Sequence, residues 1–301
     1  MNLSRRAFLG TSAAVATGLS TTPLPAAEKA RTLVLLAGTP SHPAGFHEFN
    51  AGVRLLEKCL KGVKDLEVIT LLNGYPKDDA ILDSADGILC FSDGGANHLL
   101  LREQRLKRLA GLMAKGVGLM CAHYAVEVPK DLGGPEWKDW IGGYYESLYS
   151  CNPMWSPEFT ELPKHEITNG VKPFRTKDEW YFNMRFRDDM KGVTPILTAV
   201  PTDAVRDGPY VYPKGPYKHI QEAKGRSEHM MWATERADGG RGVGFTGGHT
   251  HTNWVEPNQR KVMLNALLWI CKLPVPAGGV ASEVTAEEIQ ENLDPKPVKK
   301  K

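Results

Sequence analysis

Short apolar runs recur along the first part of the chain, and each ends at glycine or at a small polar loop. They cover residues 32–37, 66–72, 86–91 and 117–121. An apolar run without polar alternation is typical of a strand buried on both faces, as in a parallel sheet. We therefore predict four buried strands in this part of the chain.

Amphipathic segments separate these runs. Apolar residues recur at helical spacing from Val53 to Leu60, and residues 99–115 combine an apolar face with a basic one. The resulting order of strand, helix, strand, strand, helix, strand predicts an α/β fold in which helices cover an open, mostly parallel sheet.

The second half of the chain is less regular. Residues 129–224 are rich in Pro, Gly, Trp and Tyr, and we interpret them as irregular insertions that contain strands near 178–183 and 195–200. Two apolar runs, 229–235 and 242–246, flank Asp-Gly-Gly and predict a hairpin. Residues 260–271 have the pattern of a closing helix.

Both ends of the chain lie outside the predicted domain. Ser4-Arg5-Arg6-Ala7-Phe8-Leu9, a mild apolar stretch and small residues near Ala27 have the form of a twin-arginine export signal. We assign residues 1–27 to this leader, 28–275 to one domain and 276–301 to a charged tail that we expect to be extended or disordered. The leader predicts a periplasmic or other extracytoplasmic location.

Composition excludes some functions. The formal net charge is +2, with 24% charged and 42% hydrophobic residues, and no basic stripe alternates with aromatic residues, so a nucleic-acid partner is not expected. After the leader, no apolar run is as long as a membrane span. The five cysteines include Cys59, Cys90 and Cys271 in apolar stretches, which indicates buried thiols.

Histidines follow the predicted strands. They stand in the loops after the first (His42, His47), third (His98) and fourth (His123) strands, and in the glycine-rich stretch after the late strand (His249, His251). Because ligands bind beyond the carboxyl ends of parallel strands, we expect these loops to meet at one edge of the sheet.

Two kinds of chemistry suit such a cluster. Imidazoles can pass protons to and from a substrate, and we take His123 and His249 as catalytic candidates. Imidazoles with a carboxylate can instead hold a divalent metal such as Zn²⁺, for which His42, His47 and His251 are candidates. An extended chain would point His249 and His251 to the same side.

Carboxylates and aromatic residues supply the other candidates. Aromatic and apolar neighbours would partly bury Glu127 and Glu179 and raise their pKa towards the useful range for acid/base catalysis. Flat rings and polar groups near the predicted edge suit a sugar. The substrate-binding candidates are Tyr124, Asp93, Trp180, Asn253 and Trp254.

Cys121 offers a different mechanism. A cysteine at a strand end has the placement of a nucleophile elbow, with His249 as its base. The alternative is a buried structural thiol.

The sequence resembles the ThuA-like (trehalose utilisation) family over about residues 31–273. The resemblance is carried by the loop from Ser41-His42 to His47-Glu48, by 118–123, and by Ile141-Gly142-Gly143. Further matching segments are 165–171, 178–181 and 232–249. It implies the flavodoxin-like sheet of class I glutamine amidotransferases, generally without their nucleophile, and a role in carbohydrate catabolism, with keto derivatives of disaccharides as substrates.

Two hypotheses from different classes follow. The first is an exported enzyme, of hydrolase or isomerase type, that acts on a sugar or keto-sugar through histidine acid/base or metal-assisted chemistry. The second is a non-catalytic sugar-binding module. A Cys121-dependent amidotransferase-like hydrolase is a third alternative.

Overall fold

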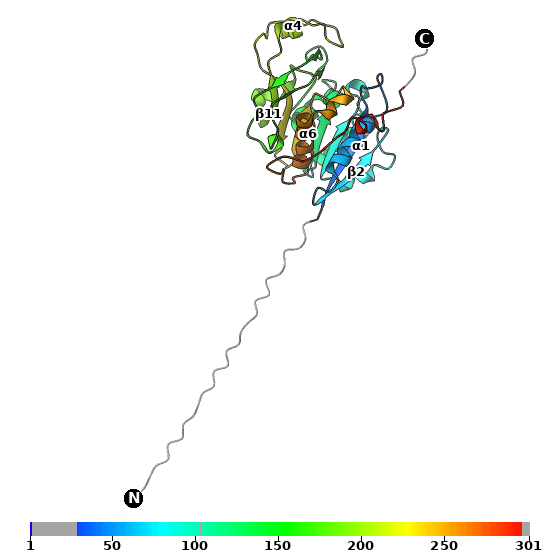
Figure 1. The fold of residues 1–301 in the computed structure, drawn as a ribbon, viewed down its shortest axis with the longest axis vertical. Coiled ribbons are helices and arrows are strands. Elements are labelled where there is room, and N and C mark those ends of the chain that lie inside the picture. The colour runs from blue at the N-terminus through cyan, green and yellow to red at the C-terminus, as the bar shows by residue number, and fades with distance from the viewer. Residues whose placement is uncertain (2–28, 103, 297–301) are drawn as a thin grey trace.

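A computed structural model describes Met1, residues 29–102 and residues 104–296. The predicted leader, apart from Met1, lies outside the described residues. The domain described here is an α/β structure with one large sheet and helices on both of its faces (Figure 1).

The central sheet contains seven strands. They are β1 (Arg31–Ala37), β2 (Leu66–Leu71), β3 (Gly87–Phe91), β4 (Gly118–Ala122), β11 (Val193–Ala199), β12 (Glu228–Glu235) and β13 (Arg241–Phe245). Their order is β11-β12-β13-β4-β3-β1-β2, with β2 and β11 at opposite edges (Figure 1). The five strands from β2 to β13 are parallel, and β12 and β11 each run antiparallel to the preceding neighbour. The predicted sheet and hairpin are therefore confirmed.

Two helical layers bury the sheet. Alternate residues of β1 face opposite sides, so Leu33 and Leu35 pack with α1 (Phe49–Leu60) and α6 (Pro257–Ile270), whereas Val34 and Leu36 pack under α2 (Arg105–Met113) and α3 (Gly134–Trp140). All four of these strand side chains are fully buried. Burial of a side chain of this size contributes roughly 1.5–3 kcal/mol, and burial on both faces explains the unbroken apolar runs.

The insertions in the middle third form three small ribbons. β5 (Gly143–Tyr144) pairs with β10 (Arg185–Phe186), β6 (Met154–Trp155) with β9 (Asp178–Glu179), and β7 (Glu158–Phe159) with β8 (Phe174–Arg175). The strand expected over 178–183 is therefore only two residues long. The remaining short elements are α4 (Asp203–Arg206), α5 (Lys218–Gln221) and the 3-10 turns η1 (Asp79–Ser84), η2 (Gly95–Asn97), η3 (His123–Val126), η4 (Glu166–Thr168), η5 (Asp188–Met190), η6 (His251–Val255) and η7 (Glu288–Gln290).

The C-terminal segment differs from the extended tail that we expected. Residues 276–296 pack against the domain, and Val280 and Ile289 join the core beside α6 with 4% and 3% of their surfaces exposed. The segment has too few apolar residues for a core of its own, but Val280, Ile289 and the partly buried Val284 pack in the core on the α1 and α6 layer. Within the described residues, no helix is long and apolar enough to cross a membrane.

Candidate functional site

Three imidazoles from three loops meet at the carboxyl edge of the parallel strands. His47 follows β1, His123 follows β4, and His249 follows β13. His47 Nε2 lies 2.9 Å from His249 Nδ1 and 3.0 Å from His123 Nε2, and the last two atoms are 3.3 Å apart. The Glu179 carboxylate joins them, with Oε2 3.0 Å from His249 Nδ1. We call His47, His123, His249 and Glu179 the histidine cluster.

Backbone contacts hold the loops of the cluster together. The His47 N–H donates to the His249 carbonyl at 3.1 Å, and Phe46 pairs with Thr250 as an isolated bridge. Gly248 has a φ of +104°, so the chain turns there as the glycine pair predicts. Asp178, which is fully buried, accepts hydrogen bonds from the N–H groups of Gly248 and Thr250 at 2.8 and 2.9 Å.

The backbone itself is strained at the site. His42, His47 and His123 all have left-handed backbone angles, with φ of 61°, 47° and 52°. Such a conformation is uncommon for residues other than glycine and is concentrated at functional sites. The surrounding fold therefore maintains these side chains in positions that the local chain does not favour.

Each member of the cluster has a further partner that fixes its orientation. His47 Nδ1 lies 2.9 Å from Asp93 Oδ1, and His123 Nδ1 lies 3.0 Å from the Thr246 carbonyl oxygen. Asn152 donates to Glu179 Oε1 at 2.7 Å. The Tyr181 hydroxyl lies 3.2 Å from His123 Nε2.

Burial disfavours the charged form of His47 and His123. His47 and His123 have 1% and 0% of their surfaces exposed. Desolvation is the main reason that the pKa of each imidazole lies well below its ordinary value, and the neighbouring histidines lower it further. His42, which stacks on His47 with ring centroids 3.6 Å apart, also has a lowered pKa, chiefly through burial.

A cavity of about 230 Å³ opens beside the cluster. Glu127 lines it, and burial followed by the charge of Glu179 raises the pKa of its carboxyl to about 7. The other lining residues are His42, His47, Tyr124, Tyr145, Ser147, Asn152, Glu179, Tyr181, Val211, Tyr212, Pro213 and His249. The cavity therefore combines a titratable acid, imidazoles and aromatic rings.

Several sequence-predicted residues meet here. His42, His47, Tyr124, Glu127, Glu179 and His249 line the cavity. His123 stands behind them in the cluster, and Asp93 orients His47. The structure thus brings the four catalytic candidates, His123, His249, Glu127 and Glu179, to one place, but groups His123, His249 and Glu179 with His47 as possible metal ligands.

Four predicted residues do not reach the cavity. His251 stands at the start of η6 and belongs neither to the cavity lining nor to the histidine cluster, and its backbone N–H donates to the Gly45 carbonyl. Asn253 donates to the Lys177 carbonyl. Trp180 and Trp254 have 0% and 1% of their surfaces exposed and pack against Phe245 in the core, which corrects their assignment to substrate binding.

Two further residues from the sequence analysis, His98 and Cys121, lie in the core and do not line the cavity. His98 is fully buried; its Nε2 lies 2.9 Å from the Ala125 carbonyl oxygen, and its Nδ1 accepts the Leu100 N–H. Cys121 is also fully buried in the core cluster beneath α3, and burial holds its thiol pKa well above the ordinary value. A protonated thiol without access to the cavity cannot act as the nucleophile.

Sequence reasoning missed several residues of the cavity, of which three matter most for its chemistry. Tyr181 and Asn152 contact the cluster, and Tyr212, with 77% of its surface exposed, stands at the mouth. Tyr181 has a detectable signal: it is two residues from Glu179, so an extended chain places both on one side and Trp180 on the other. Asn152 and Tyr212 lie in irregular loops without such a pattern.

The C-terminal segment supports the loop that carries His42 and His47. Lys296 donates to the carbonyl oxygens of Ser41, Phe46 and His47 at 2.9, 2.9 and 3.0 Å, and its ammonium lies 3.4 Å from Glu48. Only 9% of the Lys296 side chain is exposed. These contacts extend the support of the site to the end of the described chain.

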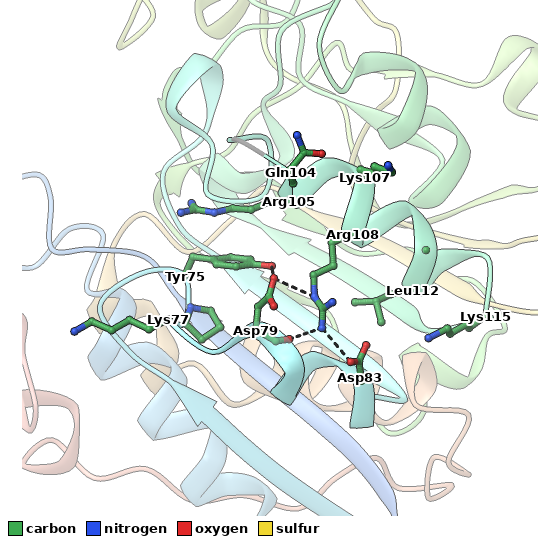
Figure 2. A pocket seen from close by; sticks show the side chains of 12 residues that line it. Tyr75, Lys77, Asp79, Asp83, Gln104, Arg105, Lys107, Arg108, Leu112 and Lys115 are labelled. Atoms are coloured by element: carbon green, nitrogen blue, oxygen red, sulfur yellow. Dashed lines mark hydrogen bonds and ion pairs between the residues drawn. The ribbon is translucent and has the colours of Figure 1, made fainter.

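A larger hollow of about 840 Å³ lies elsewhere, between α2 and η1 (Figure 2). It is open to solvent and lacks histidine. Its central groups pair with one another: Arg108 contacts Asp79 and Asp83, and the Tyr75 hydroxyl donates to Asp79 (Figure 2). Size alone does not indicate a site, and the chemistry favours the smaller cavity at the histidine cluster.

Comparison with known proteins agrees with the sequence resemblance. A family model described as ThuA, trehalose utilisation, matches residues 39–270. A ThuA-like protein from Bacteroides uniformis superposes with a TM-score of 0.58 at 16% identity, covering 83% of this chain and 95% of that one. A ThuA-like protein from Parabacteroides merdae gives 0.51 at 14% identity, covering 86% and 94%. At these identities the structures show a shared fold. Comparison with curated protein sequences finds no significant match.

Proposed function

The chain belongs to the ThuA (trehalose utilisation) family, and from this premise we propose that it is an exported enzyme that acts on a sugar or keto-sugar. The observation that carries the proposal is the convergence of His47, His123, His249 and Glu179 beside a cavity that Glu127 also lines. Buried imidazoles and carboxylates in one hollow are the usual constituents of a site for acid/base catalysis.

The cavity suits a single sugar ring. Its volume of about 230 Å³ is below the roughly 300–1,000 Å³ typical of sites for drug-sized ligands. Tyr124, Tyr145 and Tyr212 offer aromatic surfaces, while Asn152 and Ser147 offer groups that hydrogen-bond to hydroxyls. A longer saccharide would place its second ring at the mouth, beside the exposed Tyr212.

Glu127 and the histidine cluster have separate roles in this proposal. Glu127 moves a proton at a carbon or hydroxyl of the sugar, because a carboxyl with a pKa of about 7 exchanges protons readily near neutral pH. The cluster, on another wall of the same cavity, polarises a sugar oxygen and stabilises the negative charge that proton removal creates. Isomerisation of a keto-sugar needs these two roles.

The proposal is tested by following sugars and their 3-keto derivatives by NMR with purified protein. Glu127→Gln preserves shape and should lower kcat about 10²–10⁴-fold, the usual contribution of an acid/base group. Glu161→Gln, at an exposed position, is the matched control and should retain activity. Full turnover by Glu127→Gln would refute the role of Glu127. Calorimetric sugar binding with no product from any candidate would favour the non-catalytic binding module.

Export is a separate part of the proposal. It rests on the Arg5-Arg6 pair in the leader. Replacing both by lysine should keep the protein in the cytoplasm, because the twin-arginine pathway reads this pair. Cell fractionation measures the outcome, and unchanged export of the Lys-Lys variant would contradict the assignment.

A further inference from the structure

We infer that the histidine cluster binds one divalent transition-metal ion, of the Zn²⁺ class, through His47 Nε2, His123 Nε2, His249 Nδ1 and a Glu179 oxygen. The inference deepens the proposed function and rests on the same site, because the ion would supply the positive charge that polarises the sugar oxygen. It replaces the ligand set expected from the sequence, in which His42 and His251 accompanied His47.

The first argument is the direction of the imidazole lone pairs. The Thr246 carbonyl can only accept a hydrogen bond, so the Nδ1 of His123 carries the proton and its Nε2 has a lone pair. Asp93 fixes His47 in the same way, by accepting from Nδ1. The lone pairs on His47 Nε2 and His123 Nε2 therefore lie close to His249 Nδ1 and the Glu179 carboxylate. A cation among these atoms would satisfy the lone pairs together.

The second argument is the spacing of the donor atoms. The three nitrogen–nitrogen distances are 2.9, 3.0 and 3.3 Å, and the four donor atoms all lie within 4.8 Å of one another. Tetrahedral coordination with bonds of about 2.1 Å puts ligand atoms about 3.4 Å apart. Small movements of the side chains thus bring all four atoms to metal-bonding distance.

The third argument is the shell of partners behind the ligands. Metal-binding histidines usually donate their second N–H to a carboxylate or a backbone carbonyl. His47 donates to the Asp93 carboxylate, and His123 donates to the Thr246 carbonyl. Asn152 holds the other oxygen of Glu179 at 2.7 Å, which leaves Oε2 facing His249. A ligand set of three imidazoles and one carboxylate, without thiolate, suits Zn²⁺ or Co²⁺.

A neighbouring group of donors is a weaker candidate. His42, His47 and Asp93 also lie close together, with His42 Nδ1 3.7 Å from Asp93 Oδ1. That group is partly exposed, and it needs the Nδ1 of His47, whose proton already bonds to Asp93. His47 therefore turns its free nitrogen to the buried cluster, and Asp93 orients the ring through its Nδ1.

Metal content and cobalt spectroscopy test the inference. We expect about one equivalent of metal in the full chain and, after chelation and addition of Co²⁺, the visible absorption of tetrahedral cobalt. His123→Asn and Glu179→Gln should weaken Co²⁺ binding more than about 100-fold, and Asp93→Asn, which removes an orienting contact, about 10–100-fold. His219→Asn, at an exposed position outside the cluster, is the matched control and should bind as wild type. Circular dichroism confirms folding of each variant.

The outcomes separate the metal site from the enzymatic proposal. Wild-type protein that binds Co²⁺ no more tightly than His123→Asn, while both remain folded, would overturn the inference. Full sugar turnover by protein shown to be metal-free would overturn the ion's part in polarising the sugar oxygen but leave the proposed function standing. A stoichiometric ion that the variants lose, with no turnover of any sugar, would support the metal site and count against the function.

Discussion

Replacing His98 by glutamine should make the free energy of unfolding less dependent on pH. The histidine is fully buried, and desolvation lowers its pKa from 6.5 to about 4 in the folded protein. Its Nε2–H donates to the Ala125 carbonyl, and its Nδ1 accepts from the Leu100 N–H. Protonation would add a second donor opposite Leu100, so the fold accommodates the neutral ring.

The sign and size of the effect follow from these two pKa values. Below pH 6.5 the unfolded chain binds a proton at His98, but the native protein does not until about pH 4. The stabilisation is therefore complete above pH 6.5 and is lost as the pH falls through that interval. At about 1.4 kcal/mol per unit, lowering the pH from 7.5 to 5 removes roughly 2 kcal/mol of unfolding free energy.

Urea unfolding followed by tryptophan fluorescence at pH 7.5 and pH 5 measures this contribution. The glutamine amide can donate to Ala125 and accept from Leu100, but it does not titrate. The other histidines are common to both proteins, so the wild type should lose about 2 kcal/mol more than the variant. An equal loss in both would refute the assignment of His98 as a neutral core residue.

Three other changes probe the surroundings of the site. Lys296→Met should lower the unfolding free energy by about 3 kcal/mol in urea titrations, since it removes the cation beside the buried Glu48 and the hydrogen bonds to three carbonyls, whereas Lys64→Met, at an exposed lysine, should change little. Tyr212→Ala should raise KM for an accepted sugar about 10-fold through lost stacking while kcat changes little; an unchanged KM in steady-state assays would exclude contact with substrate. Cys121→Ser should keep wild-type kcat, although a buried hydroxyl costs about 1–3 kcal/mol of stability, and loss of turnover in the folded variant would restore a cysteine mechanism.

The gathering of loops at one edge was predictable because it follows from strand direction. β1, β4 and β13 are parallel, so the residues that follow them, His47, His123 and His249, approach one another whatever the details of the loops. Strand polarity could be inferred from apolar runs separated by helices. The same reasoning reaches only the loops, because it does not determine which way each side chain turns.

The predicted direction of side chains was wrong where the backbone departs from regular extended geometry. The equal orientation expected for His249 and His251 requires an extended chain, but Gly248 has a left-handed φ and a 3-10 turn starts at His251. The left-handed φ of His47 and His123 has no local sequence signal either. Where the chain is extended, at Glu179 and Trp180, alternation explains why the first faces the cluster and the second the core.

The sequence pattern did not predict that the C-terminal segment packs against the domain. Its charged composition suggested an extended tail, yet Lys296 and Asp294 contact Glu48 in the loop after β1. These contacts join residues about 250 positions apart, and the periodicity of the sequence does not predict such contacts. Composition describes the average segment, whereas a few specific contacts decide whether this one packs.

The most direct measurement is anomalous X-ray diffraction from crystals of the full chain loaded with Co²⁺. We predict one strong peak bonded at about 2.0–2.2 Å to His47 Nε2, His123 Nε2, His249 Nδ1 and a Glu179 oxygen. Imidazoles that lie apart, or a cobalt peak elsewhere with none at the cluster, would contradict the account.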